Sequence, residues 1–164
     1  MTPRASALTR ELSLDPHPEG GHYRRIHASH ASVLVGGRQR AAMTAIVFLL
    51  DAGECSRWHR IDADEAWHWQ EGDPLELLSF DAQTGRLAKT VLGNPMKSLS
   101  AMHVVPAGTW QSARPLGGYA LVACTVSPGF EWAGFELLDD SGAVAQELSR
   151  LGALNAQGRE KGED

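Results

Sequence analysis

The chain is short of several features that would place it in common classes of protein. Its two cysteines, Cys55 and Cys124, are too few for a disulfide framework, and free thiols are typical of a reducing compartment. It has no apolar run near the roughly 20 residues that a membrane helix needs, and its first residues lack the apolar core of a signal peptide. These absences predict a cytoplasmic protein with no membrane partner.

A surplus of positive charge is also absent. The 164 residues carry a formal net charge of −5, whereas nucleic acids and anionic membranes attract clustered positive charge. We therefore expect no nucleic-acid partner, although a few arginines could still hold a small anion. The length suits one domain, and a hydrophobic content of 43% suffices for a core without disulfide bonds. We expect residues 1–164 to form a single domain.

What the sequence does contain is a long series of short β-strands. Apolar residues at helical spacing predict one short helix over residues 5–14, which the following prolines end. Between residues 20 and 139, about ten apolar or alternating segments are separated by Gly, Pro, Asn and Asp, as in sandwiches and barrels. A second helix is expected at about 143–154, followed by a polar tail at 155–164. The predicted class is all-β with a short helix at each end.

A dense polar stretch in the middle of the chain carries the most specific signal. Residues 53–72 have the pattern G-x5-H-x-I-x3-E-x6-G. This resembles the first motif of the cupin superfamily, G-x5-H-x-H-x3-E-x6-G, with Ile61 in place of the second histidine. Residues 106–111 resemble the second motif, P-x-G-x2-H, with Gln111 in place of the histidine. The resemblance implies a double-stranded β-helix, a jelly-roll barrel, over residues 20–139.

A closer resemblance is to the cupin-5 family, a group of largely unassigned function. Four of its motifs occur here in order: HPEGG at 17–21, WHR at 58–60, DEAWH at 64–68 and GDPL at 72–75. The resemblance implies the jelly-roll fold with short N- and C-terminal helices, and it implies a homodimer. The strand after HPEGG is the expected dimer contact, because it would otherwise leave an open edge. The chemistry does not follow from the fold, because cupins host many activities.

The resemblance also raises the question of a metal. Metal-binding cupins hold one cation with three histidines and a glutamate, and only His59 and Glu65 stand at matching positions here. Ile61 cannot coordinate a metal, and the amide of Gln111 is a poor ligand for transition ions. We therefore expect no resident cofactor, and a weakly bound divalent metal on His59, Glu65 and Gln111 is the alternative. His68 is not a substitute, because alternation along a strand turns it away from the barrel if Glu65 points inward.

The same residues predict a small-molecule pocket inside the barrel. His59 and Glu65 are the predicted catalytic pair, with the imidazole acting as a base near neutral pH and the carboxylate orienting it. Arginine suits phosphate or carboxylate groups and tryptophan suits a ring, so we expect a polar ligand that is sugar-like or phosphorylated. The predicted ligand contacts are Trp67, Trp69, Gln111, Arg60 and Tyr119.

Three functions fit these residues. The first is a small-molecule-binding cupin whose pocket holds little or no metal, and the sequence does not decide whether it turns its ligand over. The second is a metal-independent sugar-nucleotide isomerase or epimerase, with His59 as general base and either Tyr23 or Tyr119 as the acid. The third is a metal-dependent cupin enzyme.

The HPEGG segment predicts a tight turn. Gly20 and Gly21 permit the positive φ angles that such a turn needs. We expect Glu19 to brace the turn rather than reach the barrel mouth, and His17 to organise the turn as well.

Overall fold

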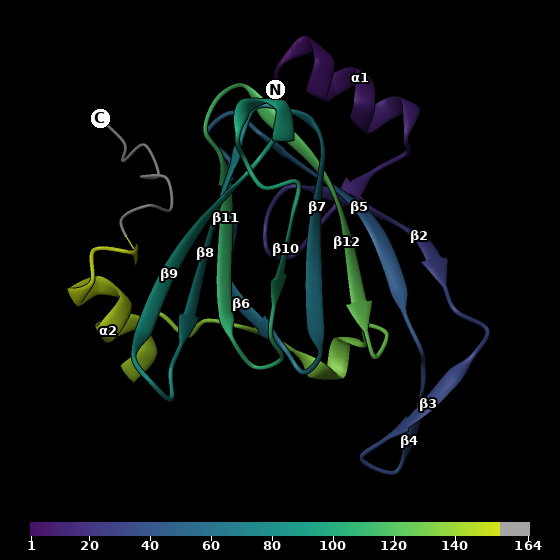
Figure 1. The fold of residues 1–164 in the computed structure, drawn as a ribbon, viewed down its shortest axis with the longest axis vertical. Helices are drawn as coiled ribbons and strands as arrows, with labels where there is room; N and C mark the ends of the chain where they lie inside the picture. Colours follow the sequence, from purple (N-terminus) through teal and green to yellow (C-terminus); the bar gives the residue numbers. More distant parts are fainter. Residues whose placement is uncertain (155–164) are drawn as a thin grey trace.

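The computed structural model describes residues 1–154, which form two facing antiparallel sheets with a short helix near each end (Figure 1). The helix expected at 143–154 is α2, and the tail at 155–164 lies outside the described residues. In chain order the elements are α1 (Pro3–Glu11), β1 (Asp15–Pro16), β2 (His22–Ala28), β3 (Ser32–Val35), β4 (Arg38–Ala41), β5 (Thr44–Asp51), β6 (Ser56–Ile61), β7 (Asp64–Gly72), β8 (Leu75–Asp81), β9 (Arg86–Leu92), η1 (Pro95–Lys97), β10 (Met102–Val105), β11 (Trp110–Pro115), β12 (Tyr119–Ser127), η2 (Trp132–Gly134), β13 (Phe135–Leu137) and α2 (Ala143–Arg150).

From β5 onward the chain passes repeatedly between the two sheets. One sheet has the strand order β1-β2-β5-β12-β7-β10, and the other has the order β13-β6-β11-β8-β9. All pairings between the named strands of residues 1–154 are antiparallel. This is the winding of a double-stranded β-helix, so the predicted fold class is confirmed.

Apolar side chains from both sheets fill one end of the barrel. Phe48 and Leu50 of β5 and Trp67 of β7 point inward and meet Leu75 and Leu77 of β8. Each of these five side chains is at most 1% exposed. Phe48 and Trp67 meet edge to face, with ring centroids 5.9 Å apart, and both also line the cavity described below. The core therefore ends where the candidate site begins.

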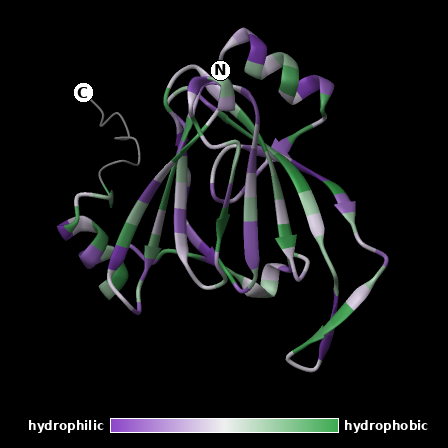
Figure 2. Ribbon diagram, in the orientation of Figure 1, coloured by the Kyte–Doolittle hydropathy of each residue, from purple (hydrophilic) through white to green (hydrophobic). Residues whose placement is uncertain are grey.

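The helices cover the outer faces of the sheets. Ala5 and Leu8 of α1 pack with Leu49 of β5, and Leu148 of α2 packs with Trp58 of β6. Because the core covers the inner face and α1 the outer one, β5 and β12 are hydrophobic along most of their length (Figure 2). Neither helix in residues 1–154 has the length and apolar character needed to cross a membrane.

Strands β3 and β4 form a hairpin that projects away from the two sheets (Figure 1). Its turn is Gly36–Gly37, as the sequence predicts, and both glycines have positive φ. At its start, β2 pairs with the two-residue strand β1. Among the described residues, the remainder of that edge of β2 has no neighbouring strand in the sheet.

Candidate functional site

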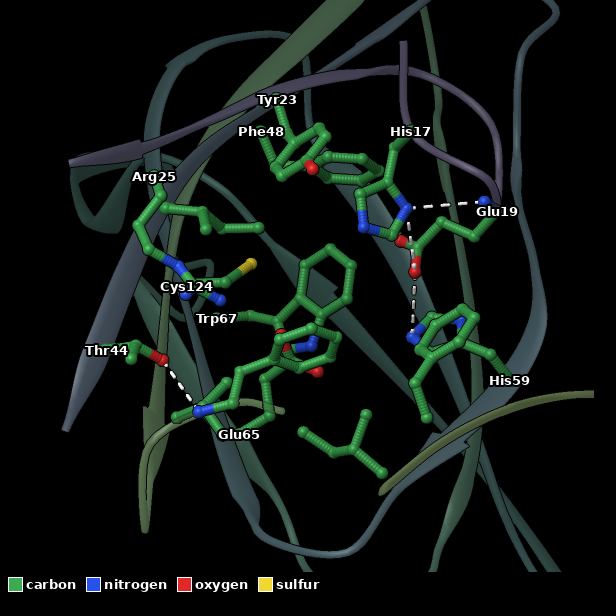
Figure 3. A pocket seen from close by; sticks show the side chains of 15 residues that line it. His17, Glu19, Tyr23, Arg25, Thr44, Phe48, His59, Glu65, Trp67 and Cys124 are labelled. Atoms are coloured by element: carbon green, nitrogen blue, oxygen red, sulfur yellow. Dashed lines mark hydrogen bonds and ion pairs between the residues drawn. The ribbon is translucent and has the colours of Figure 1, made fainter. Parts of the chain in front are cut away.

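A small cavity lies between the two sheets beyond the apolar core (Figure 3). Its volume is about 30 Å³, which is room for one or two water molecules. Strands β2, β5, β6, β7, β12 and β13 contribute its walls, together with the turn at 17–21. The lining residues are His17, Glu19, Tyr23, Arg25, Thr44, Ile46, Phe48, His59, Ile61, Glu65, Trp67, Cys124, Val126, Phe130 and Phe135.

The HPEGG turn carries Glu19 into this cavity. Gly20 has a φ of +107°, and a Cβ there would lie 2.5 Å from the carbonyl oxygen of Cys55. The N–H of Arg57 donates to the carbonyl oxygen of Glu19 at 2.7 Å and ties the turn to the start of β6. The Glu19 side chain is then only 6% exposed. Glu19 braces the turn as expected, but the expectation that it stays away from the barrel interior is wrong, because its carboxyl group lines the cavity.

The carboxyl group of Glu19 lies between two imidazole rings (Figure 3). Its Oε2 is 3.3 Å from Nε2 of His59 and 3.4 Å from Nδ1 of His17. Its Oε1 accepts a hydrogen bond from the hydroxyl of Ser56 at 3.0 Å. Three groups from two distant segments, the 17–21 turn and β6, thus meet at one carboxyl group.

Both ring nitrogens that face Glu19 are hydrogen-bond acceptors when the two rings are neutral. Nδ1 of His59 lies 2.7 Å from the carbonyl oxygen of Arg57, so Nδ1 carries the proton and a neutral ring leaves Nε2 bare. Nδ1 of His17 accepts the backbone N–H of Glu19 at 3.3 Å, so it is bare as well. An oxygen between two bare nitrogens is satisfied only if it carries a proton itself. With neutral rings, the geometry therefore places the shared proton on Glu19.

Burial favours the neutral form of all three groups. Desolvation raises the pKa of Glu19 to about 8, against a smaller lowering by the Ser56 hydrogen bond. Desolvation lowers the pKa of His17 to about 4, and repulsion from His59 adds to this shift. Desolvation also lowers the pKa of His59, opposed by the charge of Glu65. At neutral pH the site therefore holds neutral imidazoles beside a protonated acid.

Glu65 on β7 is the second carboxyl group of the cavity. Its Oε2 accepts from Nε2 of Gln111 at 2.5 Å, and Oε1 of Gln111 accepts from the indole N–H of Trp67 at 2.9 Å. The indole can only donate, which fixes the orientation of the amide. Desolvation raises the pKa of Glu65 to about 7, opposed by the charge of His59. Gln111 thus lies behind the cavity wall, where it holds Glu65 in place.

Aromatic rings shield the two histidines from water. His59 stacks on Phe135 with ring centroids 5.5 Å apart, and His17 stacks on Trp132 with centroids 5.6 Å apart. Trp132 of η2 is itself 50% exposed and forms the outer surface at this point. The aromatic cover explains why desolvation is the largest contribution to the pKa shifts of both rings.

Of the five expected ligand contacts only Trp67 lines the cavity; Gln111 lies behind its wall, and three others lie elsewhere. Trp69 packs on the apolar core and donates its indole N–H to a backbone carbonyl. Arg60 pairs with Glu136 at 2.6 Å on the outer side of β6. The hydroxyl of Tyr119 donates to Glu71 at 2.7 Å, beside α1.

The N-terminal segment supplies cavity residues that the sequence analysis did not assign to the site. These are His17, Glu19 and Arg25, and Tyr23 is the tyrosine that lines the cavity. Alternation along the strand places Tyr23 and Arg25 on one face. That this face is the inner one depends on the pairing of β2 with β5, which sets Tyr23 opposite Phe48.

The cupin motif positions offer few donor atoms to a metal here. Within residues 1–154, no group of three or more His, Cys, Asp or Glu side chains is arranged to hold a metal ion. Ile61 lines the cavity without a donor atom, and the amide of Gln111 already bonds to Trp67 and Glu65. The chemistry considered below accordingly uses the side chains of the chain itself.

A double-stranded β-helix that encloses a histidine and a glutamate at the first-motif positions defines a cupin. Residues 6–138 match the family Cupin_5, described as Cupin superfamily (DUF985). The chain belongs to this family, and the resemblance seen in the sequence is confirmed.

Solved structures share this fold. A hypothetical protein from Leishmania major has 28% identity and a TM-score of 0.84, and the match covers 95% of this chain and 99% of that one. A protein from Shewanella oneidensis has 30% identity and a TM-score of 0.83, covering 96% and 98%. An uncharacterized conserved protein with a double-stranded β-helix domain from Klebsiella pneumoniae shares the fold at 14% identity, with a TM-score of 0.54 and coverage of 79% and 93%. No curated protein matches the chain.

Proposed function

We propose that this cupin is a metal-independent isomerase or epimerase. It binds a small polar metabolite that contains a carbonyl group and moves a proton on it, with His59 as the base and Glu19 as the acid. One observation carries this proposal: the Oε2 atom of Glu19 and the Nε2 atom of His59, both on buried side chains, lie 3.3 Å apart in the cavity. A proton donor and a proton acceptor are thus assembled side by side.

This spacing suits proton transfer next to a carbonyl group. The carbonyl oxygen and the carbon that loses its proton are separated by one further carbon, so one donor and one acceptor in contact can reach both. The C–H proton moves to Nε2 of His59, and the proton on Oε2 of Glu19 moves to the carbonyl oxygen. The substrate becomes an enol, while the site holds an imidazolium beside a carboxylate. When His59 returns its proton to the former carbonyl carbon and Glu19 takes the proton of the adjacent hydroxyl group, the isomer forms and the site is restored. If the enol turns over before His59 protonates the original carbon and Glu19 takes back the enol proton, the epimer forms.

Glu65 stabilises the charged intermediate of the site in this proposal. Its charge favours the protonated form of His59, and Gln111 holds its carboxyl group through a hydrogen bond at 2.5 Å. The opposing charge lowers the cost of forming an imidazolium in a buried place. Glu65 therefore acts as a positioning and charge-balancing residue, whereas His59 and Glu19 contact the substrate.

Hydrogen exchange with solvent tests this proposal on a whole class of candidate substrates at once. The protein is incubated in D2O with a panel of aldoses, ketoses and their phosphates. The C–H signals of each compound are followed by 1H NMR. We expect at least one compound to lose the signal next to its carbonyl group, because His59 exchanges its captured proton with solvent. Dialysis against EDTA is expected to leave the exchange rate unchanged. Saturable binding without exchange by any compound would instead indicate a binding protein and contradict the proposed chemistry.

We also propose that the chain forms a homodimer through β2 and the β3–β4 hairpin. Within residues 1–154, most of one edge of β2 has no neighbouring strand, and Ile26, Val33 and Leu34 nearby are 50%, 39% and 73% exposed. A second copy is a common way to cover such an edge.

Light scattering tests this dimer. The unchanged protein is expected to have twice the mass of one chain, and the double variant Val33→Lys, Leu34→Lys is expected to have the mass of one chain. Met96→Lys, at a residue that is 92% exposed on η1, is the control. A monomeric unchanged chain at micromolar concentration would refute this proposal.

A further inference from the structure

One arginine of β2 faces the cavity. Arg25 pairs with Ile46 of β5, and the side chains of paired residues in an antiparallel ladder point to the same face of the sheet. Both residues line the cavity, and the Arg25 side chain points inward in Figure 3. Its neighbour Arg24 lies opposite Val47, which packs with α1 on the outer face of the sheet. The strand therefore brings only Arg25 to the cavity.

The charge of Arg25 has no ion-pair partner within residues 1–154. Its guanidinium lies 5.8 Å from the ring centroid of Phe130. Among the described residues that line the cavity, it is the only lysine or arginine. The two acids of the lining, Glu19 and Glu65, do not offset its charge, because burial favours their neutral forms. An anionic group is thus what a ligand can add to this lining.

Arg25 stands at the mouth of the cavity. It lines both the cavity and a wider groove of about 250 Å³ outside it, as Tyr23 does, and Trp132 also lines the groove. The inner cavity of about 30 Å³ admits only the reacting end of a metabolite. A group bound to Arg25 therefore belongs to the part of the ligand just outside the reacting end.

We infer that Arg25 binds a carboxylate group of the substrate at the mouth of the cavity, while the carbonyl end of the same molecule reaches His59 and Glu19. The inference rests on the proposed function for the reaction and adds the class of substrate, a small carboxylic acid that also carries a carbonyl group. A guanidinium group can donate two parallel N–H bonds to the two oxygens of a carboxylate. The single charges of the two groups then cancel.

A single arginine favours a carboxylate over a phosphoryl group. A phosphate monoester carries close to two negative charges at neutral pH, because its second pKa is about 6. Arg25 offsets one of them, and the groove adds only Arg24 and Asp15, whose formal charges cancel. The second charge would then lie beside the apolar side chains of Ile46 and Phe130, where an unpaired charge is costly. We therefore expect a sugar-like acid rather than a phosphorylated ligand.

Calorimetric titration with acids and their amides tests the carboxylate site. The acids are pyruvate, lactate and glucuronate, and each amide has nearly the same shape but no charge. We expect at least one acid to bind saturably and its amide to bind about tenfold more weakly or less tightly still, because charged hydrogen bonds are lost. Arg25→Gln is expected to weaken the acid by a similar factor and to change the amide little. Arg24→Gln, which removes the same charge one residue away, is the control and should leave the affinity for the acid unchanged.

Three results would overturn the inference. The first is the absence of saturable binding by all of these acids, and the second is equal affinity for the acid in Arg25→Gln and in the unchanged protein. The third is binding of glucose 6-phosphate that depends on Arg25 and is tighter than the binding of glucuronate, since this result would assign the site to a phosphoryl group.

Hydrogen exchange in D2O separates this inference from the proposed reaction. The acids are added to the panel of sugars, and exchange is followed in the unchanged protein and in Arg25→Gln. Acids that bind through Arg25 while no compound exchanges hydrogen would refute the reaction and leave the carboxylate site standing. Exchange at equal rates in Arg25→Gln and in the unchanged protein would refute the carboxylate site and leave the reaction standing.

Discussion

Replacement of Glu19 by glutamine is expected to stabilise the protein in alkaline solution and to leave it nearly unchanged in acid. The pKa of Glu19 is about 8 in the folded protein, whereas an unfolded glutamate ionises near 4.5. A raised pKa favours folding fully below pH 4.5, and this contribution is lost as the pH rises to about 8. Above that pH the folded state holds a buried carboxylate that faces two ring nitrogens without protons.

Glutamine copies the neutral acid and cannot ionise. Its amide N–H can donate to Nε2 of His59, and its oxygen can still accept from Ser56. The variant should therefore gain stability over the unchanged protein as the pH rises, reaching on the order of 3–5 kcal/mol at pH 9. Urea unfolding at pH 5, 7 and 9 measures this difference.

Glu136→Gln is the matched control for this experiment. Glu136 is exposed and pairs with Arg60, so its replacement should have a small effect that is equal at pH 7 and pH 9. If Glu19 were an ionised partner of a charged histidine, Glu19→Gln would destabilise the protein at every one of these pH values. That outcome would remove the acid from the proposed reaction.

The fold could be predicted because its signals are local. Gly36–Gly37 marks a hairpin turn, and the acidic turn after Ile61 separates β6 from β7, both as expected. Alternation along β7 also turns His68 away from the cavity, where Nε2 of its ring lies 3.2 Å from the hydroxyl of Thr125. Motif spacing brought His59 and Glu65 to the same cavity, since residues on facing strands of a jelly roll meet inside the barrel.

The partners of His59 could not be predicted in the same way. Periodicity does not determine where the side chain of a turn residue points, and Glu19 enters the cavity only because the turn is held against Cys55 and Arg57. Tyr119 shows the complementary error. It shares β12 with Cys124, which lines the cavity, but five residues of strand place it about 16 Å away. Which end of a strand reaches the cavity is a property of the whole barrel.

Replacement of His59 by asparagine is expected to reduce hydrogen exchange of the substrate by about 10² to 10⁴-fold, the usual contribution of a positioned acid or base. Asparagine keeps an N–H that can donate to the carbonyl oxygen of Arg57, but it removes the Nε2 base. His68→Asn on β7, outside the cavity lining, is the control and should exchange at the rate of the unchanged protein. The exchange rate of the substrate is measured by NMR for the two variants and the unchanged protein. Equal rates for all three would exclude His59 as the base.

The dependence of the exchange rate on pH gives a readout that a merely structural role would not produce. The base works when His59 is neutral, and because the pKa of His59 is lowered, the rate should fall only at pH values below its ordinary 6.5. The acid works when Glu19 is protonated, so the rate should also fall as the pH rises through about 8, the pKa of that group. The profile is therefore a bell, and its acidic side also reflects Glu65, whose charge assists His59 and whose pKa is about 7. In Glu19→Gln the alkaline fall should vanish together with most of the rate, whereas a fall that persists near pH 8 would assign the acid to another group.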